Sequence, residues 1–442
     1  MNSTNQHSLW VFDSGKRVGA IGYDAHEERF SFAYEPSWLA KPNAYPLSPH
    51  FPLTTVDIAS SVARRFLENL LPEGRALDVV STTHQISKNN IFALVRELGA
   101  ETSGALSFFP EGTLPESRPN MRREIPIDEL RKRIEERAQT PFAVWDGRMR
   151  MSIAGFQDKL PVYIKDKRYY LVDGALASTH ILKPEPFDER LSGLVANEHF
   201  CMRLAARLGL PTAEVGIARV PHPVLVVRRF DREASDDEVK RIHVIDACQA
   251  LDLPVAYKYE RNFGAGRDVR HIRDGVGFEG LFSTLVSHTP HKALTRQALT
   301  RWALLQYLIG NANAHGKNLS FFCRPEGLVI APFYDLVSTV QYDGLDQEFA
   351  MAYGDEFRME DVTPFAWADF AKRAGLQRSY FAREMQRMAK AALEHAPLQA
   401  LEPDYLEEEK AQLDRTVRFI EAQARKLLSV AKPMQEIDAA QL

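Results

Sequence analysis

A polar cluster between an apolar helix pattern and an apolar strand pattern constrains this chain more than any other stretch. The helix pattern runs from Trp302 to Ile309, the strand-like pattern covers residues 319–322, and residues 310–318 between them read GNANAHGKN. A separate carboxylate, Asp335, follows at the end of the sequence PFYD. An amide and a carboxylate so placed can share a Mg²⁺ ion while a nearby ammonium screens phosphate charge. The stretch therefore predicts a site for phosphoryl transfer.

One position in this cluster departs from the usual chemistry of such a loop. Protein kinases place an aspartate, which accepts the proton of the substrate hydroxyl, five residues before the metal-binding asparagine. Here Asn313 stands five residues before Asn318. An asparagine amide has nearly the shape of a carboxylate but cannot take up that proton. Loss of a general base lowers rates by about 10²–10⁴-fold.

Composition excludes several classes of protein. The 442 residues suffice for more than one domain, and their formal net charge of -4 gives no overall basic field for nucleic acid. No apolar run approaches the roughly 18 residues of a membrane span, and residues 1–8 lack the layout of a signal peptide. Cys201, Cys248 and Cys323 are widely separated among apolar neighbours, which predicts buried free thiols. These features favour a cytosolic protein with no membrane partner.

Short strands dominate the first half of the chain and helices dominate the second. Strand patterns occur within residues 9–34 and at 105–109, 160–164, 169–172, 179–183 and 224–228, with helix patterns at 62–71, 90–98, 125–137 and 197–208. From His243 onward we expect helices at 244–251, 278–287, 297–309, 364–374, 380–394 and 403–428. The sequence therefore predicts an α+β protein with a helical second half.

The last helices carry one apolar and one basic stripe. Apolar residues recur at helical spacing from Leu413 to Leu427, which is typical of core packing. The basic stripe consists of Lys372, Arg373, Arg378, Arg383, Arg387 and Lys390, with Glu384 as the one acid among them. This stripe is either a solvated helix face or a contact for the phosphates of DNA.

Several short motifs resemble the HipA-type serine/threonine kinases, the toxin halves of bacterial toxin–antitoxin pairs. Singly most are weak, but together and in this order they are specific, and they span nearly the whole chain. They are NLLP at 69–72, SIAG at 152–155 with Lys159, THILK at 179–183, NE at 197–198, RFDR at 229–232, KYE at 258–260, residues 309–318 and PFYD at 332–335. The resemblance implies a protein-kinase-like two-lobed fold. Its parts would be an N-terminal α/β subdomain (1–120), the rest of the N-lobe (121–242) and an all-helical C-terminal lobe (243–442).

The resemblance also implies roles for individual residues. Residues 154–159 resemble a loop that covers the phosphates, Lys183 the lysine that touches them, and Glu198 the glutamate that orients this lysine. Residues 228–230 resemble the adenine hinge, and residues 184–196 occupy the place of a substrate-facing activation loop. Ser152 corresponds to a serine that members of the family autophosphorylate, which switches the kinase off.

Two cofactors follow from the same resemblance, ATP and Mg²⁺. Asn318 and Asp335 resemble the Mg²⁺ ligands, and both offer hard oxygen donors. Lys183 and Asn313, at the position of the proton acceptor, are the candidate catalytic residues. The residues expected to bind ATP are Ala154, Gly155, Phe156, Gln157, Asp158, Lys159, Lys183, Arg228, Arg229, Phe230, His315, Gly316, Lys317, Asn318, Tyr334 and Asp335.

Asn313 leaves two interpretations open. The chain is either a deliberately inactivated version of an active kinase or a natural pseudokinase. The first is favoured because every other phosphate and metal position is intact, whereas a retired site would have lost more than one. In both cases we expect nucleotide binding without appreciable turnover.

Three functions follow, the first and the third of them by family analogy. The leading one is a toxin kinase that phosphorylates an aminoacyl-tRNA synthetase, of the glutamyl-tRNA synthetase type, and thereby blocks translation and causes growth arrest or persistence. The second is a small-molecule phosphotransferase, which the N-terminal α+β part and the loop at Ser152 argue against. The third is a non-catalytic corepressor that binds a HipB-like helix-turn-helix antitoxin and joins it on operator DNA.

Overall fold

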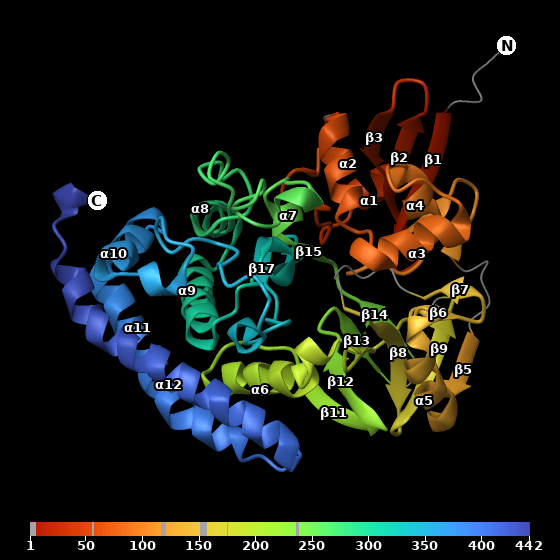
Figure 1. Cartoon of the computed structure of the whole chain (residues 1–442). Helices are drawn as coiled ribbons and strands as arrows, with labels where there is room; N and C mark the ends of the chain where they lie inside the picture. The colour runs from red at the N-terminus through yellow and green to blue at the C-terminus, as the bar shows by residue number, and fades with distance from the viewer. Residues whose placement is uncertain (1–5, 55–56, 116–120, 151–156, 175, 236–237) are drawn as a thin grey trace. The chain divides into compact units, whose positions relative to one another are not determined.

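The structure, a computed structural model, describes residues 6–54, 57–115, 121–150, 157–174, 176–235 and 238–442. The chain divides into two compact units. The first unit comprises residues 1–184, 218–255 and 321–328, and the second comprises residues 185–217, 256–320 and 329–442. Strands are concentrated in the first unit, whereas long α-helices make up most of the second (Figure 1).

A four-stranded antiparallel sheet in the order β3-β2-β1-β4 lies at the start of the first unit. Ser14 and Gly15 connect β1 to β2 with φ angles of 49° and 76°, the left-handed pair that a tight hairpin requires. Leu9, Val11 and Ile21 are fully buried because alternate side chains of a strand face the core. The strands are β1 (Gln6–Asp13), β2 (Lys16–Asp24), β3 (Arg29–Tyr34) and β4 (Leu106–Pro110).

Four helices accompany this sheet, and three of them, α1, α2 and α4, contact it directly. Asn90 caps α4, because its side chain accepts a hydrogen bond from the backbone N–H of Ala93 at 3.0 Å. The helices are α1 (Pro36–Leu39), α2 (Ser60–Glu68), α3 (Gly74–His84) and α4 (Ile91–Leu98).

A six-stranded sheet in the order β11-β12-β10-β8-β9-β5 forms the rest of the first unit. Helix α5 (Ile127–Glu135) covers it, since Leu130 and Ile134 share a buried cluster with Leu160 and Val162 of β8 (Figure 1). The strands are β5 (Met121–Ile125), β8 (Leu160–Lys165), β9 (Arg168–Asp173), β10 (His180–Pro184), β11 (Val215–Val220) and β12 (His222–Arg228).

The expected helix at 244–251 is wrong. Its first three residues form a strand, β15 (Val244–Asp246), that pairs with β16 (Ser320–Arg324) in a sheet completed by β17 (Gly327–Ile330). Only one helical turn, α7 (Ala247–Ala250), follows, and Asp246 and Gln249 form its capping box. Two further two-stranded sheets consist of β6 (Val144–Trp145) with β7 (Arg148–Met149) and β13 (Arg232–Ala234) with β14 (Val239–Arg241).

The second unit is built from long helices around aromatic side chains. Trp302, Tyr307, Tyr353 and Trp367 are all buried, and the Tyr353 and Trp367 ring centroids are 4.9 Å apart. Helices α11 and α12 lie side by side (Figure 1). The long helices are α6 (Leu194–Arg207), α8 (Phe278–His288), α9 (Lys292–Ile309), α10 (Pro364–Arg373), α11 (Arg378–Ala400) and α12 (Glu407–Glu436).

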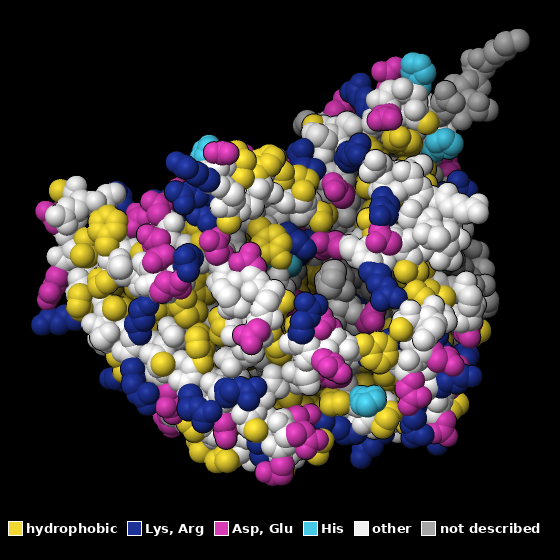
Figure 2. Space-filling view, viewed as in Figure 1, with side chains coloured by type: hydrophobic (Ala, Val, Ile, Leu, Met, Phe, Trp, Pro, Cys, Tyr) yellow, Lys and Arg dark blue, Asp and Glu magenta, His cyan; other side chains and the backbone are white. Residues whose placement is uncertain are grey.

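Several general expectations are confirmed. The protein has the α+β fold, and its second half is mostly but not wholly helical, since it contains β15, β16 and β17. The apolar stripe from Leu413 to Leu427 is buried core. The three cysteines are free and buried. In the described part of the chain, no helix combines the length and the apolar character that a membrane crossing needs. Figure 2 shows acidic and basic side chains interspersed over the visible face, in line with a net charge near zero.

Candidate active site

The loop that follows α9 is fixed by a glycine and an asparagine. Gly310 ends the helix at a φ of 64°, and a Cβ there would lie 2.6 Å from a Val340 methyl and 2.8 Å from the Phe419 ring. Both the conformation and the space therefore require glycine. The Asn311 side chain then accepts the backbone N–H of Asn313 at 3.0 Å. These constraints set the direction in which the loop leaves the helix.

Asn313 is the one exposed residue within 310–319, and its backbone organises the residues behind it. Its carbonyl oxygen accepts the N–H of His315 at 2.9 Å and the side-chain Nδ2 of Asn318 at 2.9 Å. Because Nδ2 of Asn318 is used in this way, its Oδ1 remains as an oxygen donor for a cation. Residues 316–318 form one 3-10 turn, which buries Lys317 beside these groups.

Tyr334 holds the segment that carries Asp335 against the same loop. Its hydroxyl donates to the carbonyl oxygen of Lys317 at 2.7 Å and lies 2.8 Å from Oγ of Ser320. The next residue, Asp335, has a φ of 58°, in the left-handed region that aspartate visits only sparingly. Backbone strain of this kind concentrates at functional sites.

Asn318 and Asp335 form a donor set that fits Mg²⁺ in its chemistry. Both present hard oxygen atoms, whereas no group of three or more His, Cys, Asp or Glu residues suited to a metal occurs in the described part of the chain. Mg²⁺ retains several water ligands and takes one or two protein ligands together with substrate phosphates. An amide and a carboxylate are therefore sufficient to hold it beside a bound nucleotide.

The first unit carries the expected lysine and hinge on neighbouring strands. Lys183 of β10 is buried and pairs with Leu225 of β12 in antiparallel register. Strand β12 ends at the exposed Arg228. The backbone N–H of Arg229 then donates to the carbonyl oxygen of Thr179 at 2.9 Å, which extends the pairing by one residue.

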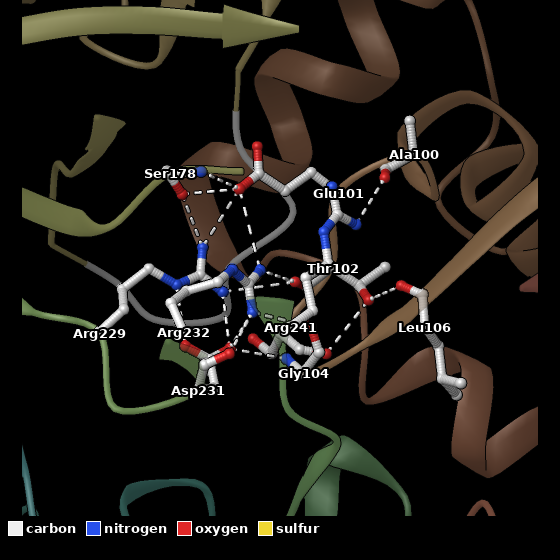
Figure 3. Close-up of polar contacts among 11 residues, drawn as sticks. Ala100, Glu101, Thr102, Gly104, Leu106, Ser178, Arg229, Asp231, Arg232 and Arg241 are labelled. Atoms are coloured by element: carbon white, nitrogen blue, oxygen red, sulfur yellow. Dashed lines mark hydrogen bonds and ion pairs between the residues drawn. The ribbon is translucent and has the colours of Figure 1, made fainter. Parts of the chain in front are cut away.

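The side chain of Arg229 belongs to a buried ion cluster, in which Arg229, Asp231 and Arg232 are buried and Glu101 and Arg241 are partly buried (Figure 3). Arg229 donates to both carboxylate oxygens of Asp231, at 2.9 and 2.7 Å, and Arg232 donates to one of them at 2.8 Å. Burial alone would raise the pKa of Asp231, but the two guanidinium groups hold it well below its usual range. The guanidinium of Arg229 is thus committed to contacts within the protein and is not available to a nucleotide.

The cluster joins the hinge to both sheets of the first unit. Oγ of Ser178, just before β10, donates to Glu101 at 2.6 Å and accepts from Arg229 at 2.9 Å. Burial and the neighbouring Arg229 lower the pKa of Arg232 to about 9. Glu101 and Asp231 together carry less charge than the three arginines, so each carboxylate is needed to balance the buried cations.

Ala154, Gly155 and Phe156 of the expected phosphate loop lie outside the described residues, and so does Ser152, the expected site of autophosphorylation. Of the remainder, Gln157 is partly buried and Lys159 is buried. Burial raises the pKa of Asp158, although Arg137 lies 3.7 Å away and opposes the shift.

The expected activation-loop segment belongs to the second unit from Glu185 onward. The Glu185 carboxylate accepts the N–H groups of Leu194 and Val195, at 2.9 and 3.0 Å, at the start of α6. Glu198 is buried in α6. It lies in a different unit from Lys183, and their pairing stays a prediction.

Most members of the basic stripe hold the second unit together. Arg373 bonds to Asp369 at 2.9 Å and lies 2.9 Å from Asp355, and Arg387 donates to Glu384 at 3.2 Å. Lys372 and Arg378 bond to backbone carbonyl oxygens near the C-terminus. These contacts favour a structural interpretation of the stripe over the DNA contact.

One residue of this site was not assigned a role from the sequence. The hydroxyl of Tyr259 donates to Oδ1 of Asn313 at 2.7 Å, and its ring lies edge-on to His315 with centroids 5.0 Å apart. The available signal was the KYE motif at 258–260, whose tyrosine has no counterpart in the general kinase pattern. The second unit therefore brings Asn313, His315, Lys317, Asn318 and Tyr334 together with Tyr259.

Comparisons with known proteins agree with this geometry. Residues 9–109 match the model of the HipA N-terminal domain, and residues 151–396 match that of the HipA-like C-terminal domain. The chain is 40% identical over 377 residues to the serine/threonine-protein kinase toxin HipA of Shewanella oneidensis, which covers 84% of each protein. It is 35% identical over 379 residues to the putative kinase Y4mE of Sinorhizobium fredii, covering 83% of this chain and 86% of that one.

A solved structure extends the likeness to three dimensions. It is the complex of HipA and HipB from Shewanella oneidensis MR-1 with its operator DNA. The matching chain aligns with a TM-score of 0.87 at 36% sequence identity, over 98% of this protein and 100% of that chain.

Proposed function

Because the chain belongs to the HipA family of serine/threonine-protein kinase toxins, we propose that it binds ATP with Mg²⁺ for phosphoryl transfer to a protein hydroxyl. Asn318 and Asp335 hold the metal in this proposal, and Lys183 and Lys317 neutralise phosphate charge. The metal supplies charge stabilisation of the transferring phosphoryl group. Asn313 keeps the acceptor hydroxyl close but takes no proton from it, so transfer by this chain is slow.

The proposal rests mainly on the geometry of the loop after α9. Asn313 is exposed at the place where a substrate hydroxyl would arrive, while its backbone fixes the amide of Asn318 at 2.9 Å. The bond from Tyr334 to Lys317 at 2.7 Å holds the residue before Asp335 against this loop, which supports the proposed role of Asp335. Such a rigid site can lose its base and still keep the residues that bind the nucleotide.

The direct test restores a carboxylate at position 313. We expect Asn313→Asp to transfer ³²P from [γ-³²P]ATP to the chain at least about 100-fold faster than the unchanged protein. Ser152→Ala in the same background should remove the label if that serine is the acceptor, and Asn318→Ala should abolish transfer. Calorimetry should show that the unchanged chain binds Mg·ATP. An Asn313→Asp variant that binds Mg·ATP yet transfers nothing would contradict the kinase assignment.

The proposed partners and the proposed target of this chain are taken from its family. The HipA of Shewanella oneidensis is found in a complex with HipB and operator DNA, and we propose that this chain likewise binds a helix-turn-helix antitoxin and joins it on DNA. An aminoacyl-tRNA synthetase of the glutamyl type is the proposed substrate. Incubation of the Asn313→Asp variant with that synthetase and [γ-³²P]ATP tests this; label on the chain alone would remove the synthetase from consideration.

Asn313 itself supports a second candidate, a pseudokinase that acts as an antitoxin-bound corepressor. This candidate predicts that the unchanged chain tightens antitoxin binding to operator DNA in a gel-shift assay whether or not ATP is present. Binding should weaken as salt rises if the complex contacts phosphates. An unchanged operator affinity after addition of the chain would exclude the corepressor.

A further inference from the structure

The segment that carries Tyr259 is held rigidly by its backbone. The N–H of Glu260 donates to the carbonyl oxygen of Ala350 at 3.0 Å, and the N–H of Gly275 donates to the carbonyl oxygen of Glu260 at 3.1 Å. The N–H of Gly316, within the loop after α9, donates to the carbonyl oxygen of Lys258 at 2.9 Å. Tyr259 thus stands between two residues whose backbones are fixed on opposite sides, one of them by the loop itself.

Further contacts hold the segment that carries Tyr259 in place. The Glu260 carboxylate accepts the N–H of Ala352 at 2.7 Å and bonds to Nε of Arg273 at 2.7 Å. A Cβ on Gly275 would lie 1.8 Å from the carbonyl oxygen of Tyr259. The backbone segments at Tyr259 and Gly275 therefore approach so closely that only glycine fits at position 275. Few positions are open to the Tyr259 ring under these constraints.

The Tyr259 side chain reaches the exposed face of the loop. The residue is 37% exposed, and its ring stands edge-on to His315 with Nζ of Lys258 at 5.6 Å from its centroid. Its hydroxyl donates to Oδ1 of Asn313 at 2.7 Å. Asn313 also uses its backbone N–H and carbonyl oxygen in the bonds to residues 311, 315 and 318.

Among the described contacts, Nδ2 is the polar atom of Asn313 that remains for a substrate. We propose that Tyr259 is a positioning residue for the side chain at 313, and that in this chain it makes Asn313 a hydrogen-bond donor to the acceptor hydroxyl. The inference deepens the proposed function and rests on it. A donor at this place engages a lone pair of the hydroxyl oxygen and offers no acceptor for its proton, so the substrate is held in an unreactive state.

The same tyrosine has a different effect on a carboxylate. In the Asn313→Asp variant the Tyr259 hydroxyl donates to one carboxylate oxygen and leaves the other toward the substrate. That oxygen accepts the hydroxyl proton as the new O–P bond forms, while the bond from the γ-phosphorus to the bridging oxygen breaks and ADP leaves. A hydrogen bond to the ionised form also favours that form, so it extends base activity to lower pH.

The kinetic test compares three proteins, all with Asn313→Asp. The first carries no other change, the second adds Tyr259→Phe, and the third adds Tyr23→Phe as a control. Tyr23 lies in β2 of the first unit and stacks on Phe92, so its phenylalanine variant also loses only a hydroxyl. Autophosphorylation rates are measured with saturating [γ-³²P]ATP from pH 5 to pH 9, and the Kd of Mg·AMP-PNP is measured by calorimetry.

We expect Tyr259→Phe to lower the plateau rate about 10-fold, the size of one hydrogen bond to a charged group. The acid limb of the pH profile should move up by about 0.5–1 unit, with the Kd unchanged within twofold. His315, Lys258 and Lys317 also lie near this group, but they are identical in all three proteins, so differences between the profiles report the loss of the Tyr259 hydroxyl. The proposal would be overturned if Tyr259→Phe changed neither the acid limb of the pH profile nor the plateau rate while the Kd of Mg·AMP-PNP stayed the same.

A second measurement does not depend on kinase activity. In the unchanged chain labelled with [¹⁵N]asparagine, the side-chain amide signal of Asn313 is identified by its loss in Asn313→Asp. Tyr259→Phe should move this signal, and Tyr23→Phe should not. If Asn313→Asp is inactive but the signal moves, the kinase assignment fails and the contact stands; a stationary signal removes the positioning role.

Discussion

Replacing Asp231 by asparagine should destabilise the first unit severely. The Asp231 carboxylate accepts two hydrogen bonds from Arg229, one from Arg232 at 2.8 Å and one from the N–H of Gly104 at 2.8 Å. Asp231→Asn removes the charge and points an N–H₂ group at one of these donors. Of the two carboxylates in the cluster, only Glu101 then remains to balance the guanidinium groups of Arg229, Arg232 and Arg241. Breaking a buried ion pair on one side costs about 3–5 kcal/mol.

Differential scanning calorimetry measures this loss. For a unit of this size 1 kcal/mol corresponds to about 2–4 °C, so the transition of the first unit should fall by roughly 10 °C. The matched control is Glu233→Gln, two residues further on, whose exposed carboxylate lies 3.4 Å from Lys240. It should change the transition by less than about 2 °C, because exposed ion pairs contribute little. Equal effects of the two variants would refute the role assigned to the cluster.

The same carboxylate predicts a dependence on pH. Arg229 and Arg232 hold the folded pKa of Asp231 below its unfolded value, even though burial opposes this. A carboxylate with a lowered folded pKa contributes its full stabilisation above the unfolded pKa of about 4, and loses it as pH falls toward the folded pKa. The transition temperature of the unchanged chain should therefore drop more steeply below pH 4 than that of Asp231→Asn. Parallel curves would contradict this assignment.

Two further predictions concern the loop after α9. Gly310→Ala should destabilise the second unit by about 2 kcal/mol or more, because it adds a Cβ at a positive φ against Val340 and Phe419; calorimetry measures this, and an unchanged transition would show that the loop can rearrange. Tyr334→Phe removes the bonds to Lys317 and Ser320 and should weaken Mg·ATP binding about 10-fold in calorimetry. Unchanged affinity would mean that Tyr334 does not place Asp335.

Long periodic segments could be predicted from the sequence, but their ends could not. Helix α9 ends at Ile309 as expected, because Gly310 is a local signal that the sequence shows. Helix α11 was expected to stop at 394 but continues to Ala400, past Pro397. Gln399 explains the extension, since it accepts a hydrogen bond from Arg207 of α6 at 2.7 Å. Such a partner, almost 200 residues away, leaves no mark on the local pattern.

The site shows the same division between local and distant causes. The residues of the loop at 310–318 were found because their chemistry is contiguous in the sequence. Arg229 was placed at the hinge from its motif, but its burial depends on Glu101 and Ser178, which no motif connects to it. Tyr259 was visible as part of a motif, yet its bond to Asn313 required the fold. The strand Val244–Asp246 was missed because its partner strand begins only at Ser320.

The buried ion cluster limits how this chain can be divided. Glu101 and Gly104 lie in the stretch that ends the N-terminal family match at residue 109, whereas Arg229, Asp231 and Arg232 lie within the C-terminal match. A fragment starting after residue 120 would keep the arginines and lose the Glu101 carboxylate and the Gly104 N–H that complete their shell. We therefore expect that the two family domains, although separable in sequence, do not fold independently of each other. Truncated versions that lack the N-terminal domain should therefore carry an unbalanced positive charge beside the expected adenine hinge.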